Sequence, residues 1–373
     1  MPGTPFAIHR SLLLRASALA LVAGVVLAGC AGYYLQAAAG QLALMRSRQP
    51  LEQVLADPAT PAALREQLLL VDSALVFARL ELGLPASGSY RHYADLHRPY
   101  VVWNVVAAPE FSLDPREWCY PVAGCATYRG WFSEQRARDE AARLAAGGDD
   151  VFVAGVAAYS TLGWFADPVL NTMLGDDPAD LAGLLFHELA HQRLYVPGDT
   201  LFNEGYASLV EEEGTRRWLA ARGDPAGLCR LDLRNERRAV VLGIVERLRT
   251  ELAAIYAGDA PLAERRHARA AAIEQARRAY ADVRAGWPEP PWFDAWFAPG
   301  LNNARLAALA AYEDLVPAFR VMLAQADGDL PAFHARVEAL GRRPAEERER
   351  VLAALVATPT SAVSAGPRAG NCP

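Results

Sequence analysis

Lysine is absent from this 373-residue sequence, and its 37 basic residues are all arginines, scattered among 43 acidic residues. Phosphate neutralisation needs a clustered basic surface, so this distribution, with a net charge of -6, argues against nucleic-acid binding. The contents of 52% hydrophobic and 21% charged residues exclude a disordered or collagen-like chain. No internal repeat and no long linker divides the chain, so we expect one large domain.

The N-terminus has the pattern of an export signal. Arg10 and Arg15 precede an apolar run from Ala16 to Ala28 that is too short for a comfortable permanent membrane helix. The run ends in Leu-Ala-Gly-Cys at residues 27–30, which resembles a bacterial lipobox. This resemblance implies that residues 1–29 are a signal peptide and that Cys30 is lipidated after cleavage. An uncleaved membrane anchor is the alternative.

Lipidation at Cys30 would make the membrane a partner of the mature protein. The mature chain would carry 35 basic and 43 acidic residues, so it would be an acidic protein anchored to the membrane by a lipid. Ala31 is not the aspartate that retains many lipoproteins in the inner membrane of Gram-negative bacteria. We therefore expect a periplasm-facing protein of the cell envelope, with the outer membrane favoured.

The small number of cysteines limits the disulfides that an oxidising compartment would allow. With Cys30 lipidated, four cysteines remain. Cys119 and Cys125 enclose a short loop containing a proline and a glycine, so we expect them to pair. That leaves Cys229 to pair with Cys372. Buried free thiols are the alternative for both pairs.

Periodicity and turn residues predict a mostly helical α+β fold with a small β-sheet ahead of the main motif. Residues 100–107 and 150–158 are rich in β-branched and aromatic residues and are predicted strands. Helical periodicity begins after Thr60-Pro61 and ends near Gly83. We expect further helix over residues 210–285 and over residues 301–357.

The strongest candidates for metal binding and catalysis lie in the motif His187-Glu188-Leu189-Ala190-His191. Asp177 and Pro178 predict the start of the helix that carries it, with Asp177 as N-cap. Two histidines four residues apart project from one helix face and can bind one Zn²⁺, while Glu188 can accept a proton from a bound water. Chance produces such a motif in a chain of this length only about once in a hundred sequences.

Glu204 is the candidate third ligand, in the segment Asn203-Glu204-Gly205-Tyr206-Ala207, and it opens a second predicted helix that continues through Trp218. A carboxylate would complete a two-histidine, one-glutamate set with an open position, which is typical of catalytic zinc. The two motifs together resemble the gluzincin metallopeptidases. The resemblance implies His187, His191 and Glu204 as zinc ligands and Glu188 as general base. The connection between the motifs is shorter than in the best-known aminopeptidases of that clan.

The chain resembles more closely a family of bacterial lipoproteins described as predicted aminopeptidases. The shared segments are the lipobox, residues 158–173, 187–191, 202–208 and 301–306. This resemblance implies a single zincin-like domain over residues 30–373 that binds one Zn²⁺ and hydrolyses peptides, as an aminopeptidase. Two alternatives stay open, an endopeptidase for misfolded envelope proteins and a non-catalytic binding or assembly lipoprotein. The sequence leaves the oligomeric state open.

Tyrosine commonly donates to the oxyanion of peptide hydrolysis, and Tyr312 is the candidate here, with Tyr159 and Tyr206 as competitors. A packing role in the core is the alternative for Tyr312.

Other polar residues near the motifs have two interpretations each. Asn203 would either hold a neighbouring loop or cap a helix, and Ser208 would either support a ligand or simply pack. Residues 211–213, all glutamate, are interpreted as a solvated helix face, with contact to a substrate amine as the alternative. Gly155 and Gly163 would let a substrate backbone approach the second predicted strand, or would simply mark a bend in it.

Overall fold

The computed structural model describes residues 32–85, 88–120, 124–175, 177–287 and 293–356. The chain forms two units, Met1–Arg48 and Gln49–Pro373. In the first unit, residues 32–47 are helical. The predicted signal peptide, Cys30 and Cys372 lie outside the described residues. No helix within the described ranges is both long and apolar enough to span a membrane.

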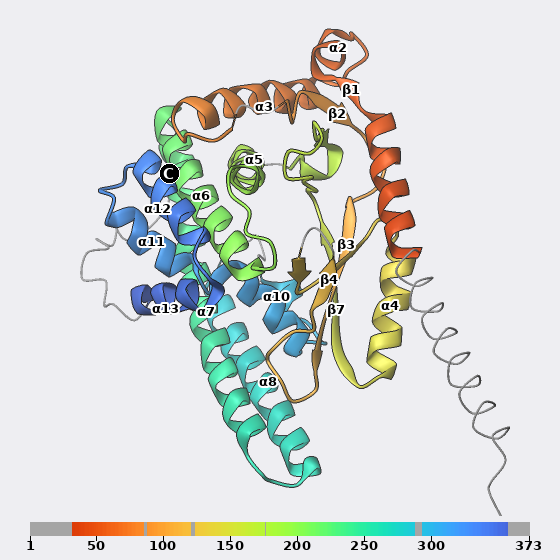
Figure 1. The fold of residues 1–373 in the computed structure, drawn as a ribbon, viewed down its shortest axis with the longest axis vertical. Coiled ribbons are helices and arrows are strands. Elements are labelled where there is room, and N and C mark those ends of the chain that lie inside the picture. Colours follow the sequence, from red (N-terminus) through yellow and green to blue (C-terminus); the bar gives the residue numbers. More distant parts are fainter. Residues whose placement is uncertain (1–31, 86–87, 121–123, 176, 288–292, 357–373) are drawn as a thin grey trace, which may run out of the picture. The chain divides into compact units, whose positions relative to one another are not determined.

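The second unit is α+β and mostly helical, as expected (Figure 1). Its longer helices are α3 (Ala62–Leu80), α4 (Glu134–Ala146), α5 (Pro178–Arg193), α6 (Thr200–Ala221), α7 (Pro225–Ala257), α8 (Leu262–Arg284), α10 (Asn303–Glu313), α11 (Val316–Ala324), α12 (Leu330–Gly341) and α13 (Ala345–Val356). The short helical segments are α2 (Leu51–Ala56), η1 (Asn171–Met173) and α9 (Asp294–Phe297).

In the part of the chain that the structure describes, the strands form three small sheets instead of the single sheet that we expected. Strands β6 (Arg129–Trp131), β3 (Val102–Pro109) and β7 (Asp149–Val156) form an antiparallel sheet in that order. Strand β2 (His92–Ala94) pairs antiparallel with β1 (Gln49–Pro50) and parallel with β8 (Val169–Leu170). Strands β4 (Trp118–Tyr120) and β5 (Gly124–Ala126) form a hairpin. Strands β3 and β7 are the two that the sequence predicted.

Strand β3 is buried on both faces because helices cover it from two sides. Side chains alternate across a strand, and Val105 packs in a cluster with Leu144 of α4. The next residue, Val106, packs instead against Ala304 and Ala307 of α10. The central sheet therefore lies between α4 and α10.

The prediction of helix over residues 210–285 is confirmed, but the region is divided among α6, α7 and α8. Helix α6 ends before Gly223, whose φ of 64° is left-handed, and Asp224 and Pro225 start α7 as N-cap and first residue. Pro261 precedes α8. The helical region predicted over residues 301–357 is likewise divided into α10 to α13. The breaks around α7 follow from the backbone preferences of glycine and proline.

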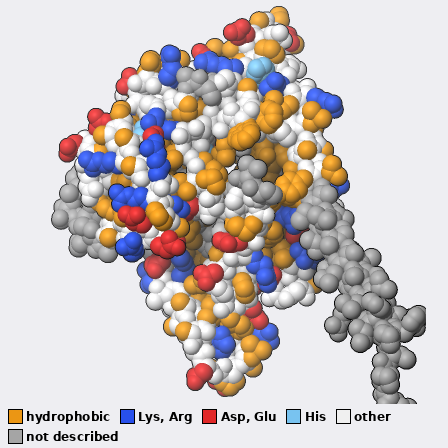
Figure 2. Space-filling model, viewed as in Figure 1, with side chains coloured by type: hydrophobic (Ala, Val, Ile, Leu, Met, Phe, Trp, Pro, Cys, Tyr) orange, Lys and Arg blue, Asp and Glu red, His pale blue; other side chains and the backbone are white. Residues whose placement is uncertain are grey.

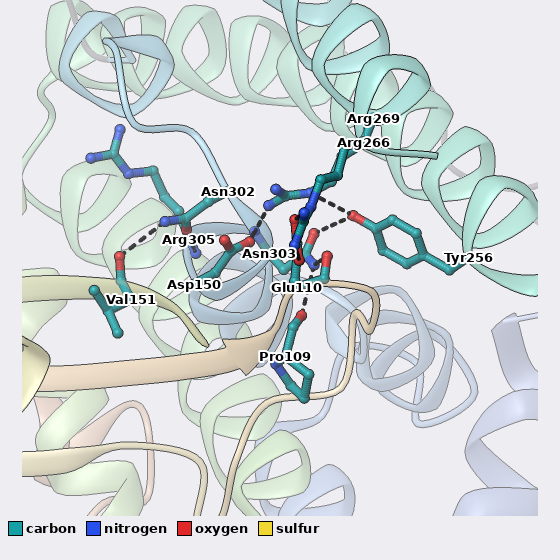
Figure 3. Close-up of polar contacts among 10 residues, drawn as sticks. All are labelled: Pro109, Glu110, Asp150, Val151, Tyr256, Arg266, Arg269, Asn302, Asn303 and Arg305. Carbon is teal, nitrogen blue, oxygen red and sulfur yellow. Dashed lines mark hydrogen bonds and ion pairs between the residues drawn. The ribbon is translucent and has the colours of Figure 1, made fainter. Parts of the chain in front are cut away.

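A polar network fastens α10 to the central sheet (Figure 3). We call it the α10 network, and its members are Asp150, Tyr256, Arg269, Asn302 and Asn303. Asn302 caps α10 by accepting from the backbone N–H of Arg305 at 3.0 Å, and it donates to the carbonyl of Val151 at 3.0 Å.

Asn303 is the centre of this network and is fully buried. Its side-chain amide donates to the carbonyls of Pro109 and Glu110, both at 3.0 Å. Its side-chain oxygen accepts from the Tyr256 hydroxyl at 2.8 Å, and its backbone N–H donates to Asp150 at 2.9 Å. These contacts hold the start of the helix whose other end carries Tyr312.

Arginine and acidic side chains mix over the C-terminal helices on the face shown in Figure 2. Within the C-terminal segment, Arg343 pairs with Glu347 of α13 at 2.9 Å.

Candidate metal centre

Helix α5 carries the His-Glu-x-x-His motif, and its start is as predicted. The Asp177 side chain accepts from the backbone N–H of Ala179 at 2.9 Å, and Pro178 is the first helical residue. Helices α5 and α6 approach closely because glycine lines their contact. A Cβ atom on Gly183 would lie only 2.8 Å from the Thr215 hydroxyl oxygen.

Helix α6 carries Glu204, and it begins earlier than expected. We predicted that Glu204 opens this helix, but α6 starts at Thr200, because the Asp199 side chain caps it by accepting from the Phe202 N–H at 3.1 Å. Glu204 therefore lies one turn inside the helix. A rigid helical backbone presents its carboxylate to α5.

The three predicted ligands converge on one point. The Nε2 atoms of His187 and His191 are 3.1 Å apart, and Glu204 Oε2 lies 3.3 Å from the first and 3.5 Å from the second. All three residues are buried, with exposed fractions of 7 to 8%. Two imidazole nitrogens and one carboxylate oxygen at these separations can share one cation.

The donor set fits zinc. Two neutral imidazoles whose Nε2 lone pairs face each other at 3.1 Å repel unless a proton or a cation lies between them. Two histidines and one carboxylate are a set that zinc prefers, and it leaves a coordination position open. One other possible cluster occurs within the described ranges, Glu117 with Cys119 and Cys125, but a disulfide joins its two cysteines.

The local charge also favours a cation. Burial lowers the pKa of His187, but hydrogen bonds and charges from Glu204 and Glu211 outweigh burial and raise this pKa well above its usual value. For Glu204, burial raises the pKa, yet the two histidines hold it far below its usual range. An environment that attracts a proton to these ligands attracts a divalent cation for the same reason.

Glu188 lies between the two histidines in sequence and is 9% exposed. Burial raises the pKa of its carboxyl above the usual value, against the opposing effect of His191 and His187. A carboxylate with a raised pKa is a better proton acceptor near neutral pH. Its place and environment suit a general base.

Of the three tyrosine candidates, Tyr312 lies beside the metal ligands. Its ring centroid is 6.2 Å from that of His187, and the charge of Glu204, followed by burial, raises its pKa well above the usual value. Tyr206 is 1% exposed, and its hydroxyl bonds His334 Nδ1 at 2.9 Å. Tyr159 packs edge-on against Phe132. Tyr206 therefore has a core role.

Glu211 is the residue that the sequence interpretation missed. We interpreted residues 211–213 as a solvated face, but Glu211 Oε2 lies 3.0 Å from Nδ1 of His187. Glu212 and Glu213 do pair with arginines, Arg320 at 2.7 Å and Arg217 at 2.6 Å. The signal available in the sequence was spacing, because Glu211 lies two helical turns after Glu204 and shares its face.

Asn203 and Ser208 lie close to the ligand Glu204. The Asn203 side chain both accepts from and donates to the backbone of Val196 at 2.8 Å, so it holds the loop between α5 and α6 and does not cap the helix. Ser208 is 9% exposed and lies one turn after Glu204 on α6.

Gly155 in β7 and Gly163 after it each have a structural reason to be glycine. A Cβ on Gly155 would lie 2.2 Å from the ring of Tyr100, so glycine is required there by an aromatic side chain. Gly163 has a left-handed φ of 82°, which any larger residue adopts with strain. Neither glycine needs a substrate backbone to explain it.

The β4–β5 hairpin lies against the loop that joins the two ligand helices. A disulfide joins Cys119 and Cys125 across the hairpin. A Cβ on Gly124 would lie 2.4 Å from the backbone nitrogen of Gly198, so hairpin and loop are in direct backbone contact. For the second predicted pair, Cys229 lies in α7, and Cys372 is outside the described residues.

The described residues form a mostly helical α+β unit with a buried cluster of two histidines and one glutamate. The chain belongs to the family described as "Putative aminopeptidase", whose profile matches residues 32–352. This membership indicates a peptidase. Neither the curated proteins nor the solved structures include a significant match to the chain.

Proposed function

We propose that this protein is a zinc-dependent aminopeptidase that uses His187, His191 and Glu204 as metal ligands. The observation that carries the proposal is the approach of three ligand atoms to within 3.1 to 3.5 Å of one another in a buried site. Family membership supports peptidase activity independently of this geometry.

Glu188 and Tyr312 have separate roles in the proposed reaction. A bound zinc ion supplies Lewis-acid activation of a water molecule and of the scissile carbonyl. Glu188 accepts the proton of the attacking water and delivers it to the leaving amine. Tyr312 donates a hydrogen bond to the developing oxyanion from beside His187. No covalent enzyme intermediate is required.

The proposal extends to location. Lipidation at Cys30 would hold the enzyme in the bacterial cell envelope, facing the periplasm and favouring the outer membrane. The peptide substrates would then be those that occur in the envelope.

Metal analysis followed by a peptide digest tests the function. The purified mature protein should bind one zinc per chain, and its digestion of a mixed-peptide library, read by mass spectrometry, should release N-terminal residues from unblocked peptides. N-terminally acetylated copies of the same peptides should remain intact. Internal cleavage of both sets would instead identify an endopeptidase, and zinc-loaded protein without any cleavage would indicate a binding role.

A further inference from the structure

Two carboxylates on α6 contact the same imidazole from opposite sides. Glu204 Oε2 lies 3.3 Å from Nε2 of His187, and Glu211 Oε2 lies 3.0 Å from Nδ1 of the same ring. The two glutamates are two helical turns apart on one face of α6, so a straight helix presents both to α5. The His187 ring therefore has a partner on each nitrogen.

The contact with Glu211 determines which nitrogen of His187 carries the proton. A carboxylate only accepts hydrogen bonds, so Nδ1 must donate its N–H to Glu211. If a metal ion replaced the proton that Nε2 shares with Glu204, this orientation would direct the Nε2 lone pair at that ion. A metal-binding histidine needs this tautomer and this ring orientation.

His191 has no equivalent support. Its Nδ1 is buried and has no hydrogen-bond partner among the described residues. The two histidine ligands are therefore unequal, and the orientation of only one of them is held by a side-chain carboxylate.

Two arginines of α7, Arg234 and Arg238, lie near Glu211. Both arginines and Glu211 line a pocket of ≈ 300 Å³ between α6, α7 and the start of α11. Arg238 also pairs with Glu313, the residue after Tyr312.

We propose that Glu211 is a positioning residue that holds His187 in the orientation and tautomer required for metal binding. This inference rests on the proposed metal site. Glu211 reaches the metal only through His187, so it should act first on metal affinity and on turnover only as a consequence. Outer carboxylates of this kind typically change metal affinity about 10-fold to 100-fold when they are removed.

The test compares Glu211→Ala, Glu211→Gln and Glu212→Gln with wild type. Zinc affinity is measured by competition with a chromophoric chelator, on samples whose circular dichroism shows a folded protein. Glu211→Ala should bind zinc about 10-fold to 100-fold more weakly. Glu211→Gln keeps an acceptor oxygen but loses the charge, so its affinity should lie in between.

Glu212→Gln is the matched control, because it removes a carboxylate from the neighbouring position, where the partner is Arg320 and not a ligand. Its zinc affinity should equal that of wild type. As a second readout, the visible absorption spectrum of the cobalt-substituted protein should change in both Glu211 variants and not in Glu212→Gln.

The outcomes separate this inference from the proposed function. Wild-type protein without zinc would overturn the metal site itself. Wild-type protein that binds zinc, with folded Glu211 variants of equal affinity and unchanged cobalt spectra, would overturn the role of Glu211 alone. If Glu211→Ala does not fold, the zinc affinity and cobalt spectrum of Glu211→Gln test the role of Glu211.

Discussion

The candidate metal centre and the α10 network are both buried polar clusters, but the polar atoms of each cluster meet different kinds of partner. In the network, the side-chain amide and oxygen of Asn303 meet protein partners, two carbonyls and the Tyr256 hydroxyl. In the metal centre, two imidazole nitrogens and a carboxylate oxygen point at one another, and all three are acceptors when the histidines carry their protons on Nδ1.

This difference distinguishes a structural cluster from a binding site. Donors that meet acceptors stabilise a fold without any ligand, because each buried group recovers the hydrogen bond that it lost to water. Converging acceptors are costly in a folded protein unless a cation joins them. Substitutions in the first cluster should therefore change stability, and substitutions in the second should change metal binding or turnover.

Glu188→Gln should have the largest effect. Glutamine keeps the size of the side chain but cannot accept a proton, so turnover should fall by about 10²-fold to 10⁴-fold while zinc content stays at one per chain. Peptidase assays and metal analysis on the same sample measure both quantities. Glu204→Gln is the contrasting variant and should weaken zinc binding. If the two phenotypes were exchanged, the assigned roles would be wrong.

Tyr312→Phe should have the next largest effect, a loss of about 10²-fold in kcat, because it removes a proposed oxyanion donor. Zinc affinity should not change. Tyr206→Phe is the matched control, since it removes the same hydroxyl from a tyrosine that bonds His334 in the core. It should cost about 1 kcal/mol of stability in a denaturant titration and leave kcat near wild type. Equal kcat values for Tyr312→Phe and wild type would show that Tyr312 is not the oxyanion donor and has only a packing role.

Asn303→Ala tests the α10 network. It leaves the buried carbonyls of Pro109 and Glu110 without their donor, so the free energy of unfolding should fall by about 1 to 3 kcal/mol. Zinc affinity, measured below the unfolding transition, should be unchanged. Arg266→Ala removes a solvent-exposed ion pair with Glu110 and should change stability much less than Asn303→Ala does. A loss of zinc with unaltered stability would contradict the structural role of the network.

Cys30→Ser should leave both clusters unaffected and change only location. Without the thiol that receives the lipid, the protein should leave the detergent-extracted membrane fraction, while zinc content and peptidase activity stay at wild-type values. Fractionation followed by immunoblotting measures this shift. An unchanged membrane fraction would mean that the apolar N-terminal segment stays as an anchor.

Features that depend on neighbours in sequence were predictable. The start of α5 follows from Asp177 and Pro178, and the meeting of His187 with His191 follows from helical spacing. Strands β3 and β7 follow from their β-branched and aromatic composition. These features need only local backbone geometry, so a single sequence contains the information.

Features that depend on contact between distant segments were not predictable. For Gly155 the sequence allowed either room for a substrate backbone or a bend in the strand, and the structure brings the ring of Tyr100 against it. Nothing local to either residue indicates that contact.

The three glutamates at residues 211–213 show what local sequence predicts and what only helix packing decides. Composition alone makes the three residues equivalent, and a solvated helix face is the usual result for such a run. The packing of α5 on α6 sets the rotation of the helix, so that Glu211 meets His187, while Glu212 and Glu213 meet arginines. The sequence identified the candidate metal-binding motif because a helix brings residues i and i+4 together, whereas the contact of Glu211 with the first histidine depends on how two helices pack.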